Sequence, residues 1–282
     1  MSLAMTTGSV TVIAEIGENH LGDAAMAHRM IEEAAKAGAD IVKFQSYRGT
    51  DARADDPERD WFQRVELSDA LHRELQARTQ QCGAEFLSSP FTLERARFLC
   101  EDLGLRTIKI ASSELLNLSL LDYVNERADV VFLSTGMASL EEIAQALTHL
   151  TRVGTTAILH CVTQYPAEDT EVNLRAIQVL ADAFPRHPIG YSDHACGIEA
   201  SLAAVALGAI VIEKHFTLAK TLPGTDHRLS ASPEEFAQMV QQIRRIERLL
   251  GQRIKAPTPR ELAIRDFVRS RWRKDSPCAS AT

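Results

Sequence analysis

This chain of 282 residues lacks the cysteine pattern of a disulfide-stabilised protein. Its cysteines are odd in number, widely scattered and include no CxxC pair; they are Cys82, Cys100, Cys161, Cys196 and Cys278. Such a distribution is typical of reduced thiols. We therefore expect a protein of the cytoplasm.

Long apolar runs and an excess of positive charge are also missing. The longest apolar stretch, residues 198–212, contains Glu199 and is too short to cross a bilayer, and no apolar signal-peptide core stands at the N-terminus. The net charge of −7 argues against nucleic-acid binding, which usually requires a basic stripe. We expect neither a membrane nor a nucleic acid as partner.

Eight short runs rich in Val, Ile, Leu or Phe are spread along the chain. Runs of this kind are typical of strands buried on both faces of a parallel sheet. The expected strands cover residues 11–17, 41–47, 84–91, 107–114, 130–137, 155–163, 188–194 and 210–217. Aromatic residues at 6% and charged residues at 24% are ordinary for a soluble enzyme.

Helical patterns separate these runs. Residues 24–37 and 68–82 are each followed by a glycine, and capping boxes at 139–142 and 232–235 open helices expected to reach Gly154 and about Gly251. Eight β-then-α units predict an α/β fold, a single-domain (β/α)8 TIM barrel over residues 11–251. No GxGxxG follows the first strand, which removes the usual reason to prefer an open dinucleotide-binding sheet.

Two terminal segments fall outside the expected barrel. Residues 1–10 are expected to form a disordered leader. Residues 252–282 are expected to form a short basic tail with one short helix near 260–269. From residue 253 onward the net charge is +5, whereas the preceding part carries −12. We interpret the tail as a solvated extension.

Polar side chains gather at the ends of the expected strands, where the active sites of barrel enzymes lie. They include Glu15, Lys43, Gln45, Ser89, Lys109, Ser112, Glu114, Ser134, Thr163, Tyr165, Ser192, His194, Glu213 and His215. Burying polar groups costs free energy. Their recurrence at one end of eight strands therefore predicts a large polar site.

Lysines and serines in this set indicate a phosphorylated, anionic ligand. Lys43 and Lys109 can neutralise phosphate or carboxylate charge, and the serine hydroxyls can donate hydrogen bonds to its oxygens. The alternative is that Lys43 pairs with Glu15, and Lys109 with Glu114, in ion pairs that serve only the structure.

The histidines near the C-terminal end of the barrel indicate a metal site. His194 and His215 end neighbouring strands, each beside a carboxylate, so they are candidate ligands of one divalent metal ion. Glu15 is the best candidate for a carboxylate that acts on the substrate or on a metal-bound water. His160, in mid-strand, is taken as structural.

The motifs at all eight strands resemble one family. They are IAEIG at 13–17, VKFQ at 42–45, FLSSPF at 86–91, KIASSE at 109–114, LSTGM at 133–137, LHC at 159–161, GYSDH at 190–194 and EKHFT at 213–217. Together they resemble the N-acetylneuraminate (sialic acid) synthase family, whose catalytic domain is a TIM barrel. The resemblance covers about residues 11 to 250.

The resemblance implies an enzyme that condenses phosphoenolpyruvate with an N-acetylated aldose to give a 2-keto-3-deoxy nonulosonic acid and phosphate. It implies Mn2+ or Mg2+ on His194 and His215, and a homodimer. It assigns phosphoenolpyruvate to Lys43, Ser89, Lys109, Ser112, Ser134 and Ser192, with Thr163 where some members have asparagine. It assigns the sugar to Gln45, Glu114, Tyr165 and Asp226. Glu15 would act on the attacking water or on the new hydroxyl proton.

Two departures leave the acceptor open. The C-terminal antifreeze-like domain of these synthases is not expected here, because about thirty residues follow the last barrel helix, and the loop at 48–64 is short. The acceptor is therefore N-acetylmannosamine, a related deoxy-diacetamido sugar or another aldehyde. Two other functions remain: a metal-dependent pyruvate aldolase, and a non-catalytic barrel that binds a sugar or a partner.

Overall fold

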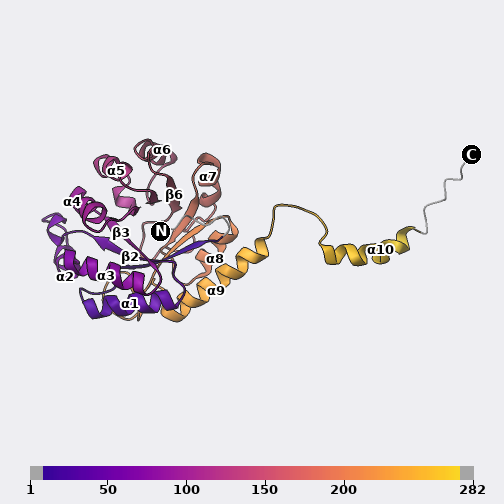
Figure 1. Cartoon of the computed structure of the whole chain (residues 1–282), viewed down its shortest axis with the longest axis horizontal. Coiled ribbons are helices and arrows are strands. Elements are labelled where there is room, and N and C mark those ends of the chain that lie inside the picture. Colours follow the sequence, from indigo (N-terminus) through magenta and orange to yellow (C-terminus); the bar gives the residue numbers. More distant parts are fainter. Residues whose placement is uncertain (1–8, 274–282) are drawn as a thin grey trace, which may run out of the picture. The chain divides into compact units, whose positions relative to one another are not determined.

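The structure, a computed structural model, describes residues 9–273 and contains eight parallel strands that curve into a barrel (Figure 1). The strands are β1 (Thr11–Gly17), β2 (Ile41–Ser46), β3 (Glu85–Pro90), β4 (Thr107–Ile110), β5 (Val130–Ser134), β6 (Thr155–His160), β7 (Ile189–Asp193) and β8 (Val211–His215). Their order is β3-β2-β1-β8-β7-β6-β5-β4. β1 pairs with both β2 and β8, and β3 lies next to β4 without a ladder of its own. The predicted TIM barrel is confirmed as a nearly closed barrel.

Helices alternate with the strands and surround them in Figure 1. They are α1 (Ala24–Lys36), α2 (Arg59–Val65), α3 (Asp69–Gln81), α4 (Leu93–Arg97), α5 (Leu118–Asn125), α6 (Leu140–Thr148), α7 (Ala176–Ala183), α8 (Glu199–Ala206) and α9 (Pro233–Leu250). A further helix, α10 (Pro259–Arg273), follows α9 in the chain and is not one of the barrel helices. Both predicted capping boxes form, Ser139 with Glu142 and Ser232 with Glu235, and each satisfies backbone N–H groups of the first turn.

Most expected strands extend too far at their C-terminal ends. The fourth stops at Ile110 because Ser112–Glu114 forms a 3-10 turn, and the fifth stops at Ser134, where Ala138 donates its N–H back to the Thr135 carbonyl. The helix predicted to reach Gly154 ends at Thr148. Polar residues beyond these ends, such as Ser112 and Glu114, thus lie outside the strands.

Side chains alternate between the barrel interior and the layer of helices. The interior nearer the N-terminal ends of the strands holds a small apolar cluster of Ile13, Ile41, Leu87, Val130, Phe132, Ala157, Leu159 and Val211. Gly190 also faces inward: a Cβ there would lie 2.4 Å from Leu159 Cδ2, so glycine lets the apolar cluster close. Because interior positions recur every second residue, the next inward residues of each strand lie directly above this cluster.

The described residues divide into two compact units, one that ends at Leu249 and one that begins at Leu250. The second contains α10, a longer helix than the one expected near 260–269. The expected leader falls mostly on residues 1–8, outside the described part. Val10, placed in that leader by the sequence, is buried, and its N–H donates to Glu247 on α9. Within residues 9–273, no helix has the length and apolar character needed to cross a membrane.

Candidate active site

Inward residues of several strands form a charged layer above the apolar cluster. The sheet register places Glu15 opposite Lys43 on β2 and opposite His215 on β8, and places Ser192 on β7 opposite Glu213 on β8. Each of these residues lies an even number of positions from an apolar interior residue of its own strand. Strand pairing therefore brings together charges that are far apart in the sequence.

Two lysines and two glutamates make a buried ion network in this layer. Lys43 Nζ lies 2.9 Å from Glu15 Oε2 and 3.6 Å from Glu213 Oε2. Lys109 Nζ lies 3.5 Å from Glu213 Oε1. All four side chains are at most 5% exposed. Lys43 thus has the glutamate partner expected from the sequence, whereas Lys109 pairs with Glu213 and not with Glu114.

Glu114 lies elsewhere. Its Oε2 accepts a hydrogen bond from Asn117 at 2.8 Å, and its side chain lines a cavity of about 270 Å³. This cavity adjoins a larger one, of about 390 Å³, which lies above the ion network. The two cavities share Glu18, Gln45, Phe62 and Phe91. The proposed sugar-binding role of Glu114 therefore concerns this adjoining space.

Hydroxyl groups surround the two lysines. Lys109 Nζ donates to Ser134 Oγ at 2.7 Å, Lys43 Nζ contacts Ser89 Oγ at 3.4 Å, and Ser192 Oγ donates to Glu213 Oε1 at 2.8 Å. Both lysines are therefore held by serines as well as by carboxylates, in an arrangement suited to a ligand rich in anionic oxygens.

The loop after β5 adds a close backbone approach. The Gly136 N–H donates to Ser112 Oγ at 2.9 Å. A Cβ at Gly136 would lie only 2.1 Å from Thr163 Oγ1 and 2.9 Å from Ser112 Oγ. Glycine at this position therefore keeps both hydroxyl groups where they are.

Burial and mutual charge shift the acidity of the network. Burial raises the pKa of Glu15 to about 7, with the Glu213 charge adding to the rise and Lys43 opposing it. Burial also acts to raise the pKa of Glu213, but Lys109 and Lys43 outweigh it and lower that pKa to about 2. Desolvation lowers the pKa of Lys109. Glu213 is thus the fixed negative charge, and Glu15 can exchange a proton near neutral pH.

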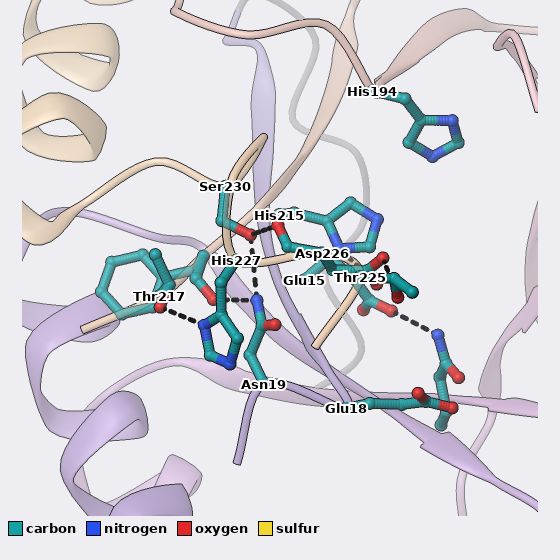
Figure 2. A network of polar contacts seen from close by, with 12 residues as sticks. Glu15, Glu18, Asn19, His194, His215, Thr217, Thr225, Asp226, His227 and Ser230 are labelled. Carbon is teal, nitrogen blue, oxygen red and sulfur yellow. Dashed lines mark hydrogen bonds and ion pairs between the residues drawn. The ribbon is translucent and has the colours of Figure 1, made fainter. Parts of the chain in front are cut away.

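His194 and His215 meet beside the charged layer, with ring centroids 5.4 Å apart (Figure 2). Burial lowers the pKa of His194 to about 4 and that of His215 to about 3, so both rings are neutral at physiological pH, the form that binds metal ions. His194 Nδ1 contacts the Val162 carbonyl at 2.6 Å, which fixes this nitrogen as the protonated one.

The two histidines fit part of a metal coordination shell. His215 Nδ1 is buried without a hydrogen-bond partner and lies 3.4 Å from Asp226 Oδ2. Within the described residues, no three His, Cys, Asp or Glu side chains converge as a complete metal site. The protein thus offers two neutral imidazoles with a carboxylate close by, and the remaining ligands of an ion would have to come from substrate or water.

A hydrogen-bond network positions the loop that carries Asp226 (Figure 2). Asn19, just after β1, donates to the Phe216 carbonyl and to Ser230 Oγ, each at 2.9 Å. Ser230 Oγ donates to the Asp226 carbonyl at 2.6 Å. Asn19 therefore ties the loop after β8 to the end of β1.

A cavity of about 390 Å³ opens above the network. All predicted site residues except Glu114 line it: Glu15, Lys43, Gln45, Ser89, Lys109, Ser112, Ser134, Thr163, Tyr165, Ser192, His194, His215 and Asp226. The structure thus brings together residues from all eight strand ends. The role assigned to each residue stays a prediction.

Sequence reasoning gave too little weight to two residues that line this cavity, Glu213 and Glu18, and to Gly136, which contacts two of its hydroxyl groups. Glu213 contacts both Lys43 and Lys109. The sequence indicated that it faces inward, because it stands two residues before His215 on the same strand. For Gly136, the only indication in the sequence of a place near the site was the neighbouring hydroxyl residues. Glu18 lines both cavities and accepts hydrogen bonds from Tyr47 at 2.8 Å and Trp61 at 2.6 Å. The Trp61 contact joins distant segments and left no sequence signal.

Fold and cavity together define a TIM-barrel protein with an ionisable site at the C-terminal ends of its strands, which is where enzymes of this fold carry out their chemistry. Residues 30–255 match the NeuB family, and the chain belongs to that family.

Relatives of this chain include synthases of N,N'-diacetyllegionaminic acid and of N-acetylneuraminate 9-phosphate. The N,N'-diacetyllegionaminic acid synthase of Campylobacter jejuni is 44% identical over 92% of this chain and 82% of its own. The human N-acetylneuraminate-9-phosphate synthase is 36% identical over 90% of this chain and 75% of its own. A crystal structure of the N-acetylneuraminic acid synthetase of Leptospira borgpetersenii in complex with citrate matches with a TM-score of 0.89 and 37% identity, over 95% of this chain and 93% of that one. The chain is thus similar to synthases throughout the barrel.

Proposed function

We propose that this protein condenses phosphoenolpyruvate with an N-acetylated aldose, giving a 2-keto-3-deoxy nonulosonic acid and phosphate. The observation that carries the proposal is the pair of buried lysines, each held by a serine and a glutamate, at the base of one cavity. Family membership supports the same conclusion. A pyruvate aldolase would have little use for so many donors to phosphate.

Phosphoenolpyruvate would occupy the charged layer. Lys43 and Lys109 neutralise its phosphate and carboxylate charge, and Ser89, Ser112, Ser134, Thr163 and Ser192 donate to its oxygens. Glu15 and Glu213, whose Oε2 atoms face Lys43, would also accept hydrogen bonds from hydroxyl groups brought by the substrates or by water. The acceptor sugar would lie above, against Gln45, Tyr165 and Asp226, and extend toward Glu114.

The reaction forms a bond between C3 of phosphoenolpyruvate and the aldehyde carbon of the open-chain sugar. The aldehyde oxygen becomes a hydroxyl by gaining a proton. A water oxygen adds at C2 and phosphate leaves from the same carbon, which becomes the ketone as that oxygen loses both protons, one in effect to the former aldehyde oxygen and one to phosphate. Glu15, with a pKa raised to about 7 by burial, is suited to give or take a proton at either oxygen near neutral pH.

His194 and His215 would hold Mn2+ or Mg2+, with Asp226 beside them. A divalent ion supplies a Lewis acid for the aldehyde oxygen, where negative charge develops. His194 donates from Nδ1 to the Val162 carbonyl, which leaves Nε2 unprotonated and able to bind a metal ion. In His215, the nitrogen without a hydrogen-bond partner is Nδ1, and this atom would be the second metal ligand.

The test is phosphate release by the purified protein, together with the mass of the product. Phosphoenolpyruvate and Mn2+ are supplied with N-acetylmannosamine, a 2,4-diacetamido-2,4,6-trideoxyhexose or 6-phosphorylated N-acetylmannosamine in turn. Release must require all three components and stop when EDTA is added. Calorimetric titration with phosphoenolpyruvate separates the alternatives: an aldolase for pyruvate would bind none, and a non-catalytic barrel would turn over no aldose.

We also propose that the protein works in the cytoplasm as a homodimer. Cys82, Cys100, Cys161 and Cys196 are free thiols in the described part of the chain, which suits a reducing compartment. The dimer rests on the family resemblance, and light scattering of the purified protein tests it.

A further inference from the structure

Asp193 and Lys214 form a second buried ion pair behind the two histidines. Asp193 precedes His194 and Lys214 precedes His215, so their side chains point away from the cavity into the layer between strands and helices. Lys214 Nζ lies 3.2 Å from Asp193 Oδ2, and both side chains are fully buried. Neither side chain lines the cavity.

The pair is bonded to the backbone on the far side of His194. Asp193 Oδ1 accepts from the Ala195 N–H at 2.9 Å, and Lys214 Nζ donates to the Ala195 carbonyl. Ser201 on α8 donates to Asp193 Oδ2 at 2.6 Å. The residues before and after His194 are thus tied to the residue before His215 by one charged cluster.

Stability alone does not explain such a cluster. Apolar side chains of similar volume often stabilise a core at least as well as a buried ion pair does, because desolvating two charges is costly. The hydrogen bonds of an ion pair are directional, however, and they fix the position of one strand end against the next. Here the two strand ends are those that carry His194 and His215.

We propose that Asp193 and Lys214 are positioning residues that set the spacing of His194 and His215 for a divalent ion. The inference rests on the metal role proposed above. Two imidazoles that share an ion must each place a nitrogen about 2.1 Å from it, with a tolerance of about 0.2 Å. A small slip of β8 against the loop after β7 exceeds that tolerance, and the cluster opposes this movement.

The test measures Mn2+ affinity by electron paramagnetic resonance, which reads free Mn2+ without any turnover. The principal variant is Asp193→Asn with Lys214→Met, which removes both charges together. Lys214→Arg keeps the charge but changes its reach, and serves if the double variant does not fold. The control is Asp69→Asn, which breaks the remote ion pair to buried Arg95, where Arg95 Nη1 and Asp69 Oδ1 are 2.7 Å apart. All proteins are compared at a temperature where unfolding curves show them folded.

We expect 10- to 100-fold weaker Mn2+ binding in the double variant, as is usual when residues that orient metal ligands are lost. Lys214→Arg should weaken binding severalfold, and Asp69→Asn should leave it unchanged. In steady state, the Mn2+ concentration giving half-maximal rate should rise while kcat at saturating Mn2+ changes little.

Mn2+ affinities within twofold of wild type in folded Asp193 and Lys214 variants would overturn the inference and leave the proposed function standing. Equal weakening in Asp69→Asn would also overturn it, because the effect would then belong to lost stability. If the wild-type protein itself binds no Mn2+, the metal role falls, and the inference falls with it.

Discussion

Replacing Glu213 with glutamine is the perturbation that most directly tests the buried charge network. The substitution keeps the shape of the side chain and its ability to accept the Ser192 hydrogen bond, but removes the negative charge facing both lysines. Lys43 retains Glu15 at 2.9 Å, whereas Lys109 loses its only carboxylate partner within 4 Å in the described part of the chain.

Removing one partner of a buried ion pair typically costs about 3–5 kcal/mol. We use the low end, about 3 kcal/mol, because Lys43 keeps Glu15 as a partner and because the network borders a cavity. At roughly 2–4 °C per kcal/mol for a chain of this size, the melting temperature should fall by about 6–12 °C. Differential scanning calorimetry measures it.

The same variant should respond more strongly to an anionic ligand. Phosphoenolpyruvate would supply the charge that Lys109 has lost, so it should raise the melting temperature of Glu213→Gln more than that of wild type. Because the Glu213 charge contributes to the raised pKa of Glu15, its removal should lower that pKa. The acid limb of the kcat/KM profile should then move to lower pH.

Glu114→Gln is the matched control, because Glu114 contacts Asn117 and not Lys109. Its melting temperature should stay close to that of wild type. The reasoning is refuted if Glu213→Gln melts within 1 °C of wild type, or if phosphoenolpyruvate stabilises both proteins equally.

Three further predictions concern other parts of the molecule. Gly136→Ala places a Cβ 2.1 Å from a cavity hydroxyl, so phosphoenolpyruvate affinity measured by calorimetry should fall at least tenfold; unchanged affinity would remove that loop from the site. Asp69→Asn leaves the buried Arg95 guanidinium short of a partner and should cost about 2 kcal/mol in urea unfolding, less than a fully buried pair because the carboxylate is partly exposed. The pKa of Asp69 is lowered by Arg95 against the opposing effect of burial, so this contribution is present above about pH 4 and is lost as pH falls further. Because the pKa values of His194 and His215 are about 4 and about 3, Mn2+ affinity should stay constant from pH 8 to about pH 6, and a loss centred near pH 6.5 would contradict the neutral histidines.

The alternation of strands and helices could be predicted because it depends on local patterns. Apolar runs such as that in β1 identify buried strands, and the Ser139–Glu142 capping box satisfies N–H groups of its own first turn. The boundaries were less certain. The strand end at Ile110 depends on where Ser112–Glu114 turns over the cavity, which the apolar pattern does not record.

The residue types of the site were also predictable, because polar residues inside apolar strands stand out. The ion-pair partners of these residues could not be predicted. The alternative interpretation pairs Lys109 with Glu114, five residues away, but Lys109 contacts Glu213 on a strand more than a hundred residues distant. Asp193 stands one residue before His194 and Glu213 two residues before His215, so Asp193 points into the helix layer and Glu213 into the cavity.

The sequence by itself therefore determined the class of fold, the end of the barrel that carries the site, and the side chains available there, because each depends on short-range periodicity. Only the tertiary structure decided which charge neutralises which, that Glu15 has a pKa near 7, and that the two histidines share a corner. These properties arise from burial and from distances of 2.9–3.6 Å between charged side-chain atoms of different strands, and such distances are fixed by the closure of the barrel.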